Sequence, residues 1–291
     1  MIKNYLVVWI SISLASCSTE VFKEDPKSEK DFPEVQKEER KHQGDYKFES
    51  QQDSKELIDG LVINWKSKSD GPIIETGDVV NINYEVRLKD STLIESNMKF
   101  GLRTYPFMVG FGLQTKGWDL ALTNLHVGDS AEIFIPAALG RGERGYKERD
   151  KYSGEIKEVI PPNSDLILIL RVESLEEPIR EIDGNKVWRL LENKNNTAKF
   201  DEGNTVEFHC MVSTPSNPMY VNTFKNKPPF SLNLEDSGVV PGLKKALIGS
   251  KEGDRLYIFV PSHQGYKSRG YQKLVKPNEP LFYNVMIMKV Q

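Results

Sequence analysis

The stretch KGWDLALTNLHVGDSAEIFIP, residues 116–136, returns later in the chain as PGLKKALIGSKEGDRLYIFVP, residues 241–261. The glycine at the second position, the Ala-Leu pair, the Gly-Asp pair and the closing proline recur 125 residues apart. The same spacing relates Arg144-Gly145-Tyr146 to Arg269-Gly270-Tyr271. A register kept over about thirty positions indicates two copies of one structural unit.

Each quoted stretch predicts a short helix followed by a strand. Apolar residues at helical spacing predict helices near 117–125 and 242–248. Upstream, apolar residues stand at every second position from Val80 to Leu88 and from Val206 to Val212, the pattern of half-buried strands. Closing strands are expected at 166–172 and 281–290. Each copy is therefore predicted to be an α+β domain, an antiparallel β-sheet wrapped around one short α-helix.

The first residues have the features of a secretory signal. Lys3 precedes a short apolar run that ends at Ala15, and about 11 residues are too few to cross roughly 30 Å of hydrocarbon. A charged start, a short apolar core and small residues before a cut site are typical of such signals. We therefore expect residues 1–16 to be removed.

The run closes with Leu14-Ala15-Ser16-Cys17, which resembles the lipobox of bacterial lipoproteins. The resemblance implies that the Cys17 thiol carries diacylglycerol and that its amino group is acylated after cleavage. Two or three acyl chains anchor a protein stably to a membrane. The alternative is an ordinary signal peptide with a chance cysteine near its end.

The segment 17–55 is rich in charged and polar residues and poor in apolar ones. Such a segment cannot bury enough surface to fold by itself, so we expect a disordered tether with a reach of roughly 35 Å; a binding tail is the alternative. Domain 1 is expected at 56–177 and domain 2 at 178–291. Domain 1 has nine more residues between Tyr146 and Pro161 than domain 2 has between Tyr271 and Pro277, which predicts a longer loop.

Composition points away from several classes of function. Lys and Arg number 39 against 42 Asp and Glu, and the net charge of −3 offers no argument for nucleic-acid binding. The four histidines lie far apart with no metal-ligand spacing, so no metal site and no cofactor are expected. Cys210 alternates with Val206 and Phe208, which predicts a buried thiol.

The ordered motifs resemble the FKBP-type peptidyl-prolyl isomerase domain. In the first copy they are Tyr84, Phe107-Met108-Val109-Gly110, Gly117-Trp118, Val127-Gly128-Asp129, Ile135-Pro136 and Ile160-Pro161-Pro162-Asn163. In the second they are Phe230, Gly238-Val239-Val240-Pro241-Gly242-Leu243, Glu252-Gly253-Asp254, Val260-Pro261-Ser262-His263 and Pro277-Asn278. The resemblance implies a five- or six-stranded sheet, an aromatic pocket for an X-Pro segment, and catalysis without a nucleophile or a metal.

The resemblance also assigns a set of pocket positions to each domain. Those in domain 1 are Tyr84, Ile94, Glu95, Tyr105, Thr115, Trp118, Arg141, Ile160 and Leu168. Those in domain 2 are Phe230, Val239, Val240, Leu243, Tyr266, Val275 and Tyr283. Trp118 and Phe230 could instead be ordinary core residues.

Each domain departs from the family pattern at different points. Domain 1 has Arg141 where the family has a tyrosine whose hydroxyl donates a hydrogen bond, and Ile94-Glu95 in place of a Phe-Asp pair. Domain 2 keeps this tyrosine as Tyr266 but has Cys210 in place of the strand tyrosine. Of the two, the domain 2 pocket is expected to bind proline better.

Gly140-Arg141-Gly142-Glu143-Arg144-Gly145 matches the spacing of a dinucleotide-binding loop. No amphipathic helix follows it, so a loop over the pocket is the better interpretation.

The resulting hypothesis is a prolyl isomerase of the cell envelope, held by lipid on Cys17 and acting on proline-containing segments of unfolded or envelope proteins. Ser18 is not a strong inner-membrane retention signal, which favours the outer membrane. The alternative is a non-catalytic peptide-binding or chaperone module of an envelope complex.

Overall fold

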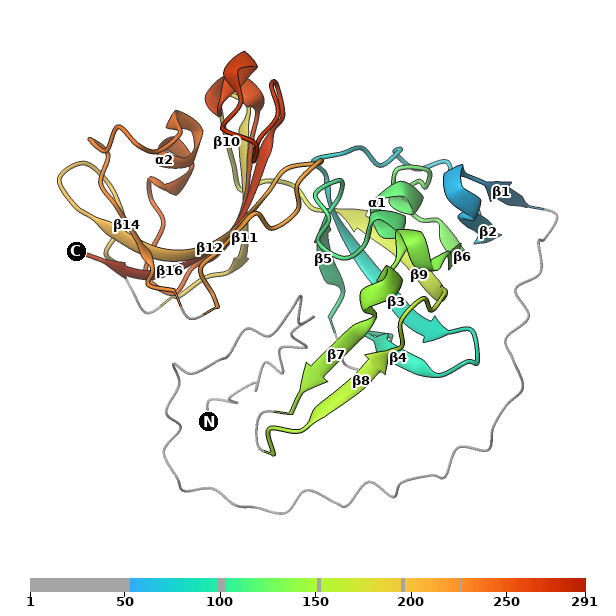
Figure 1. The fold of residues 1–291 in the computed structure, drawn as a ribbon. Helices are drawn as coiled ribbons and strands as arrows, with labels where there is room; N and C mark the ends of the chain where they lie inside the picture. Colours follow the sequence, from blue (N-terminus) through green and yellow to red (C-terminus); the bar gives the residue numbers. More distant parts are fainter. Residues whose placement is uncertain (1–52, 99–102, 151–152, 195–196, 226) are drawn as a thin grey trace, which may run out of the picture.

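The computed structural model describes residues 53–98, 103–150, 153–194, 197–225 and 227–291. The expected signal sequence, Cys17 and most of the expected tether lie outside these ranges. The described residues form two seven-stranded sheets, one from each copy of the repeat (Figure 1). In these ranges no helix is both long enough and apolar enough to cross a membrane.

The sheet of domain 1 is antiparallel, in the order β1-β2-β6-β9-β3-β4, with β5 also paired to β3. Its strands are β1 (Ser54–Glu56), β2 (Val62–Ser67), β3 (Val79–Leu88), β4 (Leu93–Ser96), β5 (Tyr105–Met108), β6 (Ser130–Ile135) and β9 (Leu166–Leu175). The sheet thus begins two residues before the expected boundary at residue 56. The longer loop of domain 1 forms a separate hairpin of β7 (Tyr146–Arg149) and β8 (Ile156–Ile160).

The sheet of domain 2 repeats this plan in the order β10-β11-β15-β16-β12-β13, with β14 paired to β12. Its strands are β10 (Arg180–Ile182), β11 (Asn185–Leu191), β12 (Val206–Ser213), β13 (Val221–Asn222), β14 (Phe230–Leu232), β15 (Arg255–Val260) and β16 (Leu281–Val290). Seven strands replace the expected five or six, because each sheet gains an N-terminal hairpin and short strands that pair with β3 or β12.

One short α-helix lies in each domain, α1 (Lys116–Leu122) and α2 (Pro241–Leu247). Helix α1 ends three residues before the expected limit at residue 125. The Thr123 hydroxyl donates to the Asp119 carbonyl at 3.1 Å, and the Asn124 amide donates to the Leu120 carbonyl at 2.9 Å. These side-chain donors bond to carbonyls of the last helical turn, where the backbone no longer supplies all the partners, and the helix ends there.

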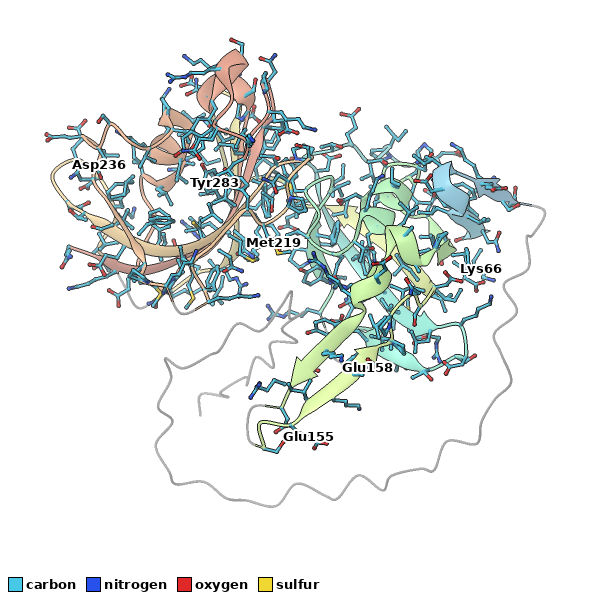
Figure 2. The ribbon with its side chains drawn as sticks, in the orientation of Figure 1. Lys66, Glu155, Glu158, Met219, Asp236 and Tyr283 are labelled. Carbon is cyan, nitrogen blue, oxygen red and sulfur yellow. The ribbon has the colours of Figure 1, made fainter. Side chains whose placement is uncertain are left out.

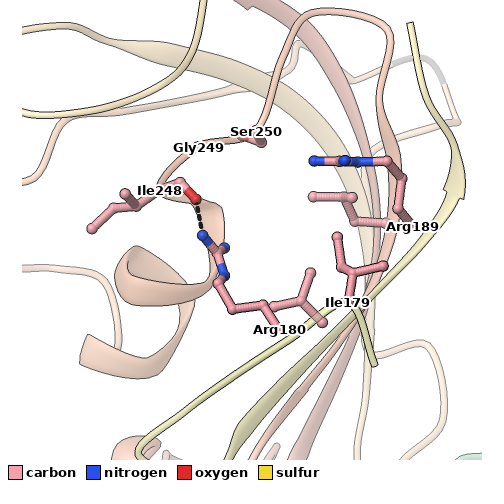
Figure 3. Close-up of a pocket in the computed structure, with 8 residues that line it drawn as sticks. Ile179, Arg180, Arg189, Ile248, Gly249 and Ser250 are labelled. Carbon is pink, nitrogen blue, oxygen red and sulfur yellow. Dashed lines mark hydrogen bonds between the residues drawn. The ribbon is translucent and has the colours of Figure 1, made fainter. Parts of the chain in front are cut away.

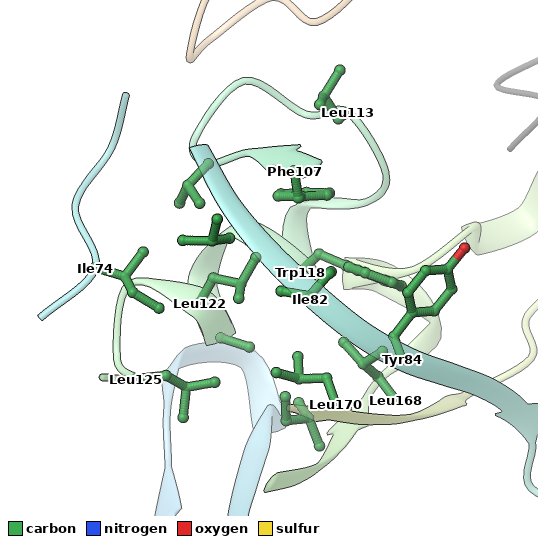
Figure 4. Packing of buried hydrophobic residues seen from close by; sticks show 14 of the residues in the cluster. Ile74, Ile82, Tyr84, Phe107, Leu113, Trp118, Leu122, Leu125, Leu168 and Leu170 are labelled. Atoms are coloured by element: carbon green, nitrogen blue, oxygen red, sulfur yellow. The ribbon is translucent and has the colours of Figure 1, made fainter. Parts of the chain in front are cut away.

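The core of domain 1 lies between the helix and the inner face of the sheet (Figure 4). Ile82 and Tyr84 project from β3 and meet Trp118 and Leu122 of the helix and Leu168 of β9, and all five are at most 2% exposed. Alternation along β3 puts its apolar residues on this face, as the sequence pattern predicts.

The outer face of the domain 2 sheet packs against domain 1. Trp188, Tyr257 and Phe282 belong to the same apolar cluster as the domain 1 core. Phe111, which is fully buried, lies 5.6 Å from the Phe282 ring and 6.1 Å from the Phe259 ring, measured between ring centres. The Trp188 indole N–H donates to the Glu176 carbonyl at 2.6 Å. The two domains therefore share an apolar interface.

Candidate functional site

The pocket positions of domain 1 come together above Trp118. The Tyr84 and Trp118 rings form a T-shaped pair with their centres 5.2 Å apart, and the Phe107 ring stacks on the Trp118 ring with centres 5.6 Å apart. Tyr105 approaches Tyr84 at 6.1 Å. Trp118 is only 2% exposed, so it supports the pocket from within the core.

A polar network occupies the domain 1 pocket. The Tyr84 hydroxyl donates to Glu95 Oε1 at 2.8 Å, and Arg141 Nη2 donates to Gln114 Oε1 at 3.2 Å. Burial raises the pKa of Glu95, while the Tyr84 hydrogen bond and the charge of Arg141 oppose that rise. Burial lowers the pKa of Arg141. A carboxyl group and a guanidinium therefore stand among the residues assigned to this pocket.

The remaining domain 1 positions differ in accessibility. Ile160, Leu168 and Thr115 are buried, at 5%, 0% and 6% exposure, whereas Ile94 and Tyr105 are partly exposed. Thr115 Oγ1 has no hydrogen-bond partner among the described residues. Tyr105 also lies against Tyr257 of domain 2, and burial raises its pKa well above the usual value. One wall of this pocket is thus continuous with the interface between the domains.

In domain 2, six of the seven predicted positions gather in one apolar cluster. Its members from the predicted set are Val239, Val240, Leu243, Tyr266, Val275 and Tyr283. Cys210 and Tyr220 join the same cluster. Cys210 is 2% exposed, which confirms the prediction of a buried thiol. Burial raises the pKa of this thiol to about 12. Figure 2 shows Tyr283 within the body of this domain.

Phe230 is the exception in domain 2. It is 46% exposed, lies on strand β14 and contacts the Phe208 ring at 6.0 Å between centres. It is therefore neither enclosed core nor part of the apolar cluster that holds the other positions.

The Tyr266 side chain stacks on Tyr271 with ring centres 4.8 Å apart. Tyr266 is half-buried, and burial, followed by the nearby Tyr271, raises its pKa, so its hydroxyl keeps its proton at neutral pH. The same arrangement exists in domain 1, where the Arg141 guanidinium lies 5.4 Å from the centre of the Tyr146 ring. Tyr146 and Tyr271 are not among the residues predicted to line the two pockets. The Arg-Gly-Tyr repeat, which places them at matching positions of the two domains, was the signal that could have identified them.

The glycine-rich segment 140–145 runs past the domain 1 pocket without a helix after it. It joins two 3₁₀ turns, Ala137–Leu139 and Gly142–Arg144, and then enters strand β7. Across the ranges that the structure describes, no three His, Cys, Asp or Glu side chains gather as a metal site.

Comparison with known proteins agrees with this architecture. A model of the family FKBP-type peptidyl-prolyl cis-trans isomerase matches residues 71–173 and again residues 196–288. The peptidyl-prolyl cis-trans isomerase FKBP10 of Mus musculus is 26% identical over 194 residues, which are 67% of this chain and 31% of that protein. FK506-binding protein 1 of Eremothecium gossypii is 36% identical over 116 residues, 38% of this chain and 90% of that protein.

Solved structures include similar chains. The crystal structure of the three FKBP domains of wheat FKBP73 is 20% identical, with a TM-score of 0.39, and the alignment covers 80% of this chain and 95% of that one. The chain spans about a third of the length of the FKBP10 proteins that it matches.

Proposed function

Since the chain belongs to the FKBP-type peptidyl-prolyl cis-trans isomerase family, we propose that it accelerates rotation about X-Pro peptide bonds in other proteins, chiefly at the domain 2 pocket. The observation that supports this choice is the lining of that pocket. Val239, Val240 and Leu243 belong to the same apolar cluster as Tyr266. At the positions that match Glu95 and Arg141, domain 2 has the uncharged Val221 and Tyr266.

An apolar pocket with a hydroxyl donor suits this reaction. Rotation about a peptide bond must overcome about 18–20 kcal/mol because amide resonance keeps the group planar. Resonance also places charge on the carbonyl oxygen, so an apolar lining favours the twisted amide, which is less dipolar, over the planar one. The Tyr266 hydroxyl, protonated at neutral pH, would orient the carbonyl; by the family resemblance the Val240 N–H is a second donor.

For domain 1 the favoured role is binding without efficient catalysis. Its Tyr84–Glu95 and Arg141–Gln114 hydrogen bonds would have to rearrange before an apolar proline ring entered. Exposing a paired charge to an apolar ligand is costly. The same groups could instead hold polar parts of an extended segment, and this observation supports the alternative of a peptide-binding or chaperone module.

A protease-coupled isomerisation assay tests the proposal. Tyr266→Phe removes one donor and is expected to lower kcat/KM about 3- to 10-fold. Val239→Glu, which puts a charge at a half-buried wall position, is expected to lower it more than 10-fold. Tyr84→Phe in domain 1 is the matched control and should leave the rate nearly unchanged. If the chain binds unfolded proteins but never raises the isomerisation rate above the uncatalysed one, it is a binding module and not an isomerase.

We further propose that the chain is exported and held at the envelope, favouring the outer membrane, by lipid on Cys17, with proline-containing segments of unfolded or envelope proteins as its clients. The support is the sequence alone, namely the apolar run and Leu14-Ala15-Ser16-Cys17. Labelled palmitate should enter the wild-type chain and not Cys17→Ser, and the wild type should fractionate with membranes. Equal labelling of both chains would contradict lipidation at Cys17.

A further inference from the structure

Domain 2 contains a second hollow, separate from its proline pocket. It has a volume of about 270 Å³ and lies between strands β10, β11 and β15 and the segment 248–250 that follows helix α2 (Figure 3). None of the residues assigned to the proline pocket lines it. Ligand pockets usually measure about 300–1,000 Å³, so this one is sized for a small group.

Three polar residues face this hollow, and each has a buried atom without a hydrogen-bond partner among the described residues. The atoms are Arg180 Nε, Arg189 Nε and Ser250 Oγ. The Arg189 side chain extends into the space between Ser250 and Ile179 (Figure 3). Arg189 Nε lies 3.3 Å from an Asp254 carboxylate oxygen and is paired by charge. Buried polar atoms are almost always satisfied in folded proteins, so Arg180 Nε and Ser250 Oγ point to a partner that the described residues do not provide.

The charge around the hollow is positive. Arg189 pairs with Asp254 at 3.3 Å and with Glu192 at 3.6 Å, and Lys251 also pairs with Glu192 at 3.3 Å. Arg180 donates to the carbonyls of Ala246 and Ile248 at the end of helix α2, and no carboxylate in the described ranges pairs with it. Three cations against two carboxylates leave one positive charge uncompensated. Burial, and then the like charge of Arg189, lowers the pKa of Arg180.

The rest of the lining is apolar. Val187 and Leu256 form the inner wall, at 2% and 1% exposure. Ile179 and Ile248 stand at the rim with 54% and 37% of their surface exposed, which is unusual for isoleucine. A ligand would therefore meet cationic donors and an apolar surface together.

Domain 1 has different residues at the positions that match Arg189 and Ser250. Trp65 pairs with Ala131 across the sheet as Arg189 pairs with Leu256, so Trp65 holds the position of Arg189. The Trp65 indole N–H donates to Asp129 at 2.9 Å. Leu125, fully buried, stands where the 125-residue repeat puts Ser250. At these two positions domain 1 has Trp65 and Leu125, whereas domain 2 has Arg189 and Ser250.

We propose that this hollow, the Arg180–Arg189–Ser250 pocket, binds a carboxylate attached to a short branched apolar group. Arg180 Nε and the Ser250 hydroxyl, which lack partners among the described residues, can each donate a hydrogen bond to the carboxylate, and Arg189 adds positive charge beside them. The apolar group would lie on Val187 and Leu256, and Ile179 and Ile248 would cover it. A free branched-chain acid and the C-terminal Leu, Ile or Val of a polypeptide share this chemistry.

Isothermal titration of the full chain with 4-methylpentanoate and with its neutral amide tests the charge requirement. The acid is expected to bind at least 10-fold more tightly than the amide. Arg189→Gln should weaken binding of the acid at least 10-fold, and Ser250→Leu, which installs the domain 1 residue, should abolish it. Lys66→Gln, which removes an exposed cation of domain 1 paired with Glu132, is the control and should bind as the wild type does.

The source of the carboxylate is resolved by a hexapeptide ending in leucine, free or C-terminally amidated. A free peptide that binds at least 10-fold more tightly than 4-methylpentanoate identifies a polypeptide terminus, and equal affinity identifies a small acid. Equal binding of acid and amide, unchanged binding in both variants, or no binding at millimolar ligand overturns the proposal. Should Ser250→Leu fail to fold, Arg189→Gln with Arg189→Lys as its charged counterpart decides alone. Isomerase activity of the variants reports separately on the proline pocket.

Discussion

At the position where domain 1 has Arg141, domain 2 has Tyr266, and each side chain rests on a tyrosine five residues later. Arg141 lies over Tyr146 and Tyr266 stacks on Tyr271. The backbone therefore presents both side chains in the same way, with similar φ and ψ, and at this position the two domains differ in the chemistry of the side-chain tip. Glu95 accompanies Arg141 as its counter-charge.

The first prediction follows from this difference. Replacing both Glu95→Val and Arg141→Tyr should give domain 1 measurable isomerase activity, because the pair of charges leaves together and a hydroxyl donor replaces them. The assay is done in a Val239→Glu background, in which the domain 2 pocket is disabled. The single variant Arg141→Tyr is the control: it leaves Glu95 buried without its counter-charge, so reduced stability is expected. No gain of rate in a folded double variant would contradict this account.

The second prediction concerns Asp119 on helix α1. Its carboxylate accepts the backbone N–H groups of Gly110 and Gly112, each at 2.8 Å, and burial raises its pKa from 3.8 to about 6. A carboxyl group whose pKa rises on folding contributes stability below its unfolded pKa and loses it as the pH rises through the folded pKa. Relative to Asp119→Asn, the wild type should lose about 2–3 kcal/mol of unfolding free energy between pH 4 and pH 7.

Urea unfolding at pH 4, 5, 6 and 7 measures this difference. Asp70→Asn, at an exposed position of the same domain, corrects for the general response of the chain to pH. Parallel curves for the wild type and Asp119→Asn would show that Asp119 does not titrate in this range.

At the scale of elements, the loops that border the two pockets depend on a matched glycine. Gly145 and Gly270 adopt φ values of +57° and +63°, a region that favours glycine. A Cβ at Gly145 would lie 2.3 Å from the Ile160 carbonyl oxygen, and one at Gly270 would lie 2.5 Å from that of Val275. Ile160 and Val275 are pocket positions, so the glycine allows the loop to close onto the pocket wall.

The third prediction is that Gly145→Ala and Gly270→Ala each cost about 2–4 kcal/mol of unfolding free energy, since backbone strain adds to a clash with a carbonyl. Thermal or urea unfolding measures the loss. Gly154→Ala has a φ of +72° but no atom within 4 Å, so it should lose only about 1–2 kcal/mol. Gly238→Ala, with open space and no positive φ, should change little. Equal losses at all four positions would contradict a steric role.

At the scale of the whole molecule, domain 2 supports the loop that leads into the domain 1 pocket. Phe111 lies in the chain between Gly110 and Gly112, whose backbone N–H groups both donate to the Asp119 carboxylate. Its ring contacts Phe259 and Phe282 of domain 2. Large aromatic rings dominate the energy of such interfaces. The interface therefore couples the stability of the two domains.

The fourth prediction is that Phe111→Ala uncouples the domains. Loss of a fully buried ring costs about 3–5 kcal/mol of stability. Because the Phe111 ring packs between the domains, the loss weakens their association. We expect calorimetry to separate one transition into two, and small-angle scattering to report a larger radius. Phe230→Ala, at an exposed position away from the interface, is the control. A single, unshifted transition in Phe111→Ala would show that the interface does not couple the domains.

Local sequence determined the repeat, the α+β fold and the buried Cys210, because apolar alternation and the 125-residue register reflect the burial of neighbouring positions. Six of the seven residues that the sequence assigns to the domain 2 pocket lie in the apolar core cluster of that domain, and their role in a pocket stays a prediction. The tertiary structure decided the rest. The exposure of Phe230, the stacking of Tyr266 on Tyr271 and the contact of Phe111 with domain 2 depend on which surfaces meet. The sequence alone did not predict the Arg180–Arg189–Ser250 pocket. Its residues come from three separate elements, and the space between them exists only because those elements do not pack closely there.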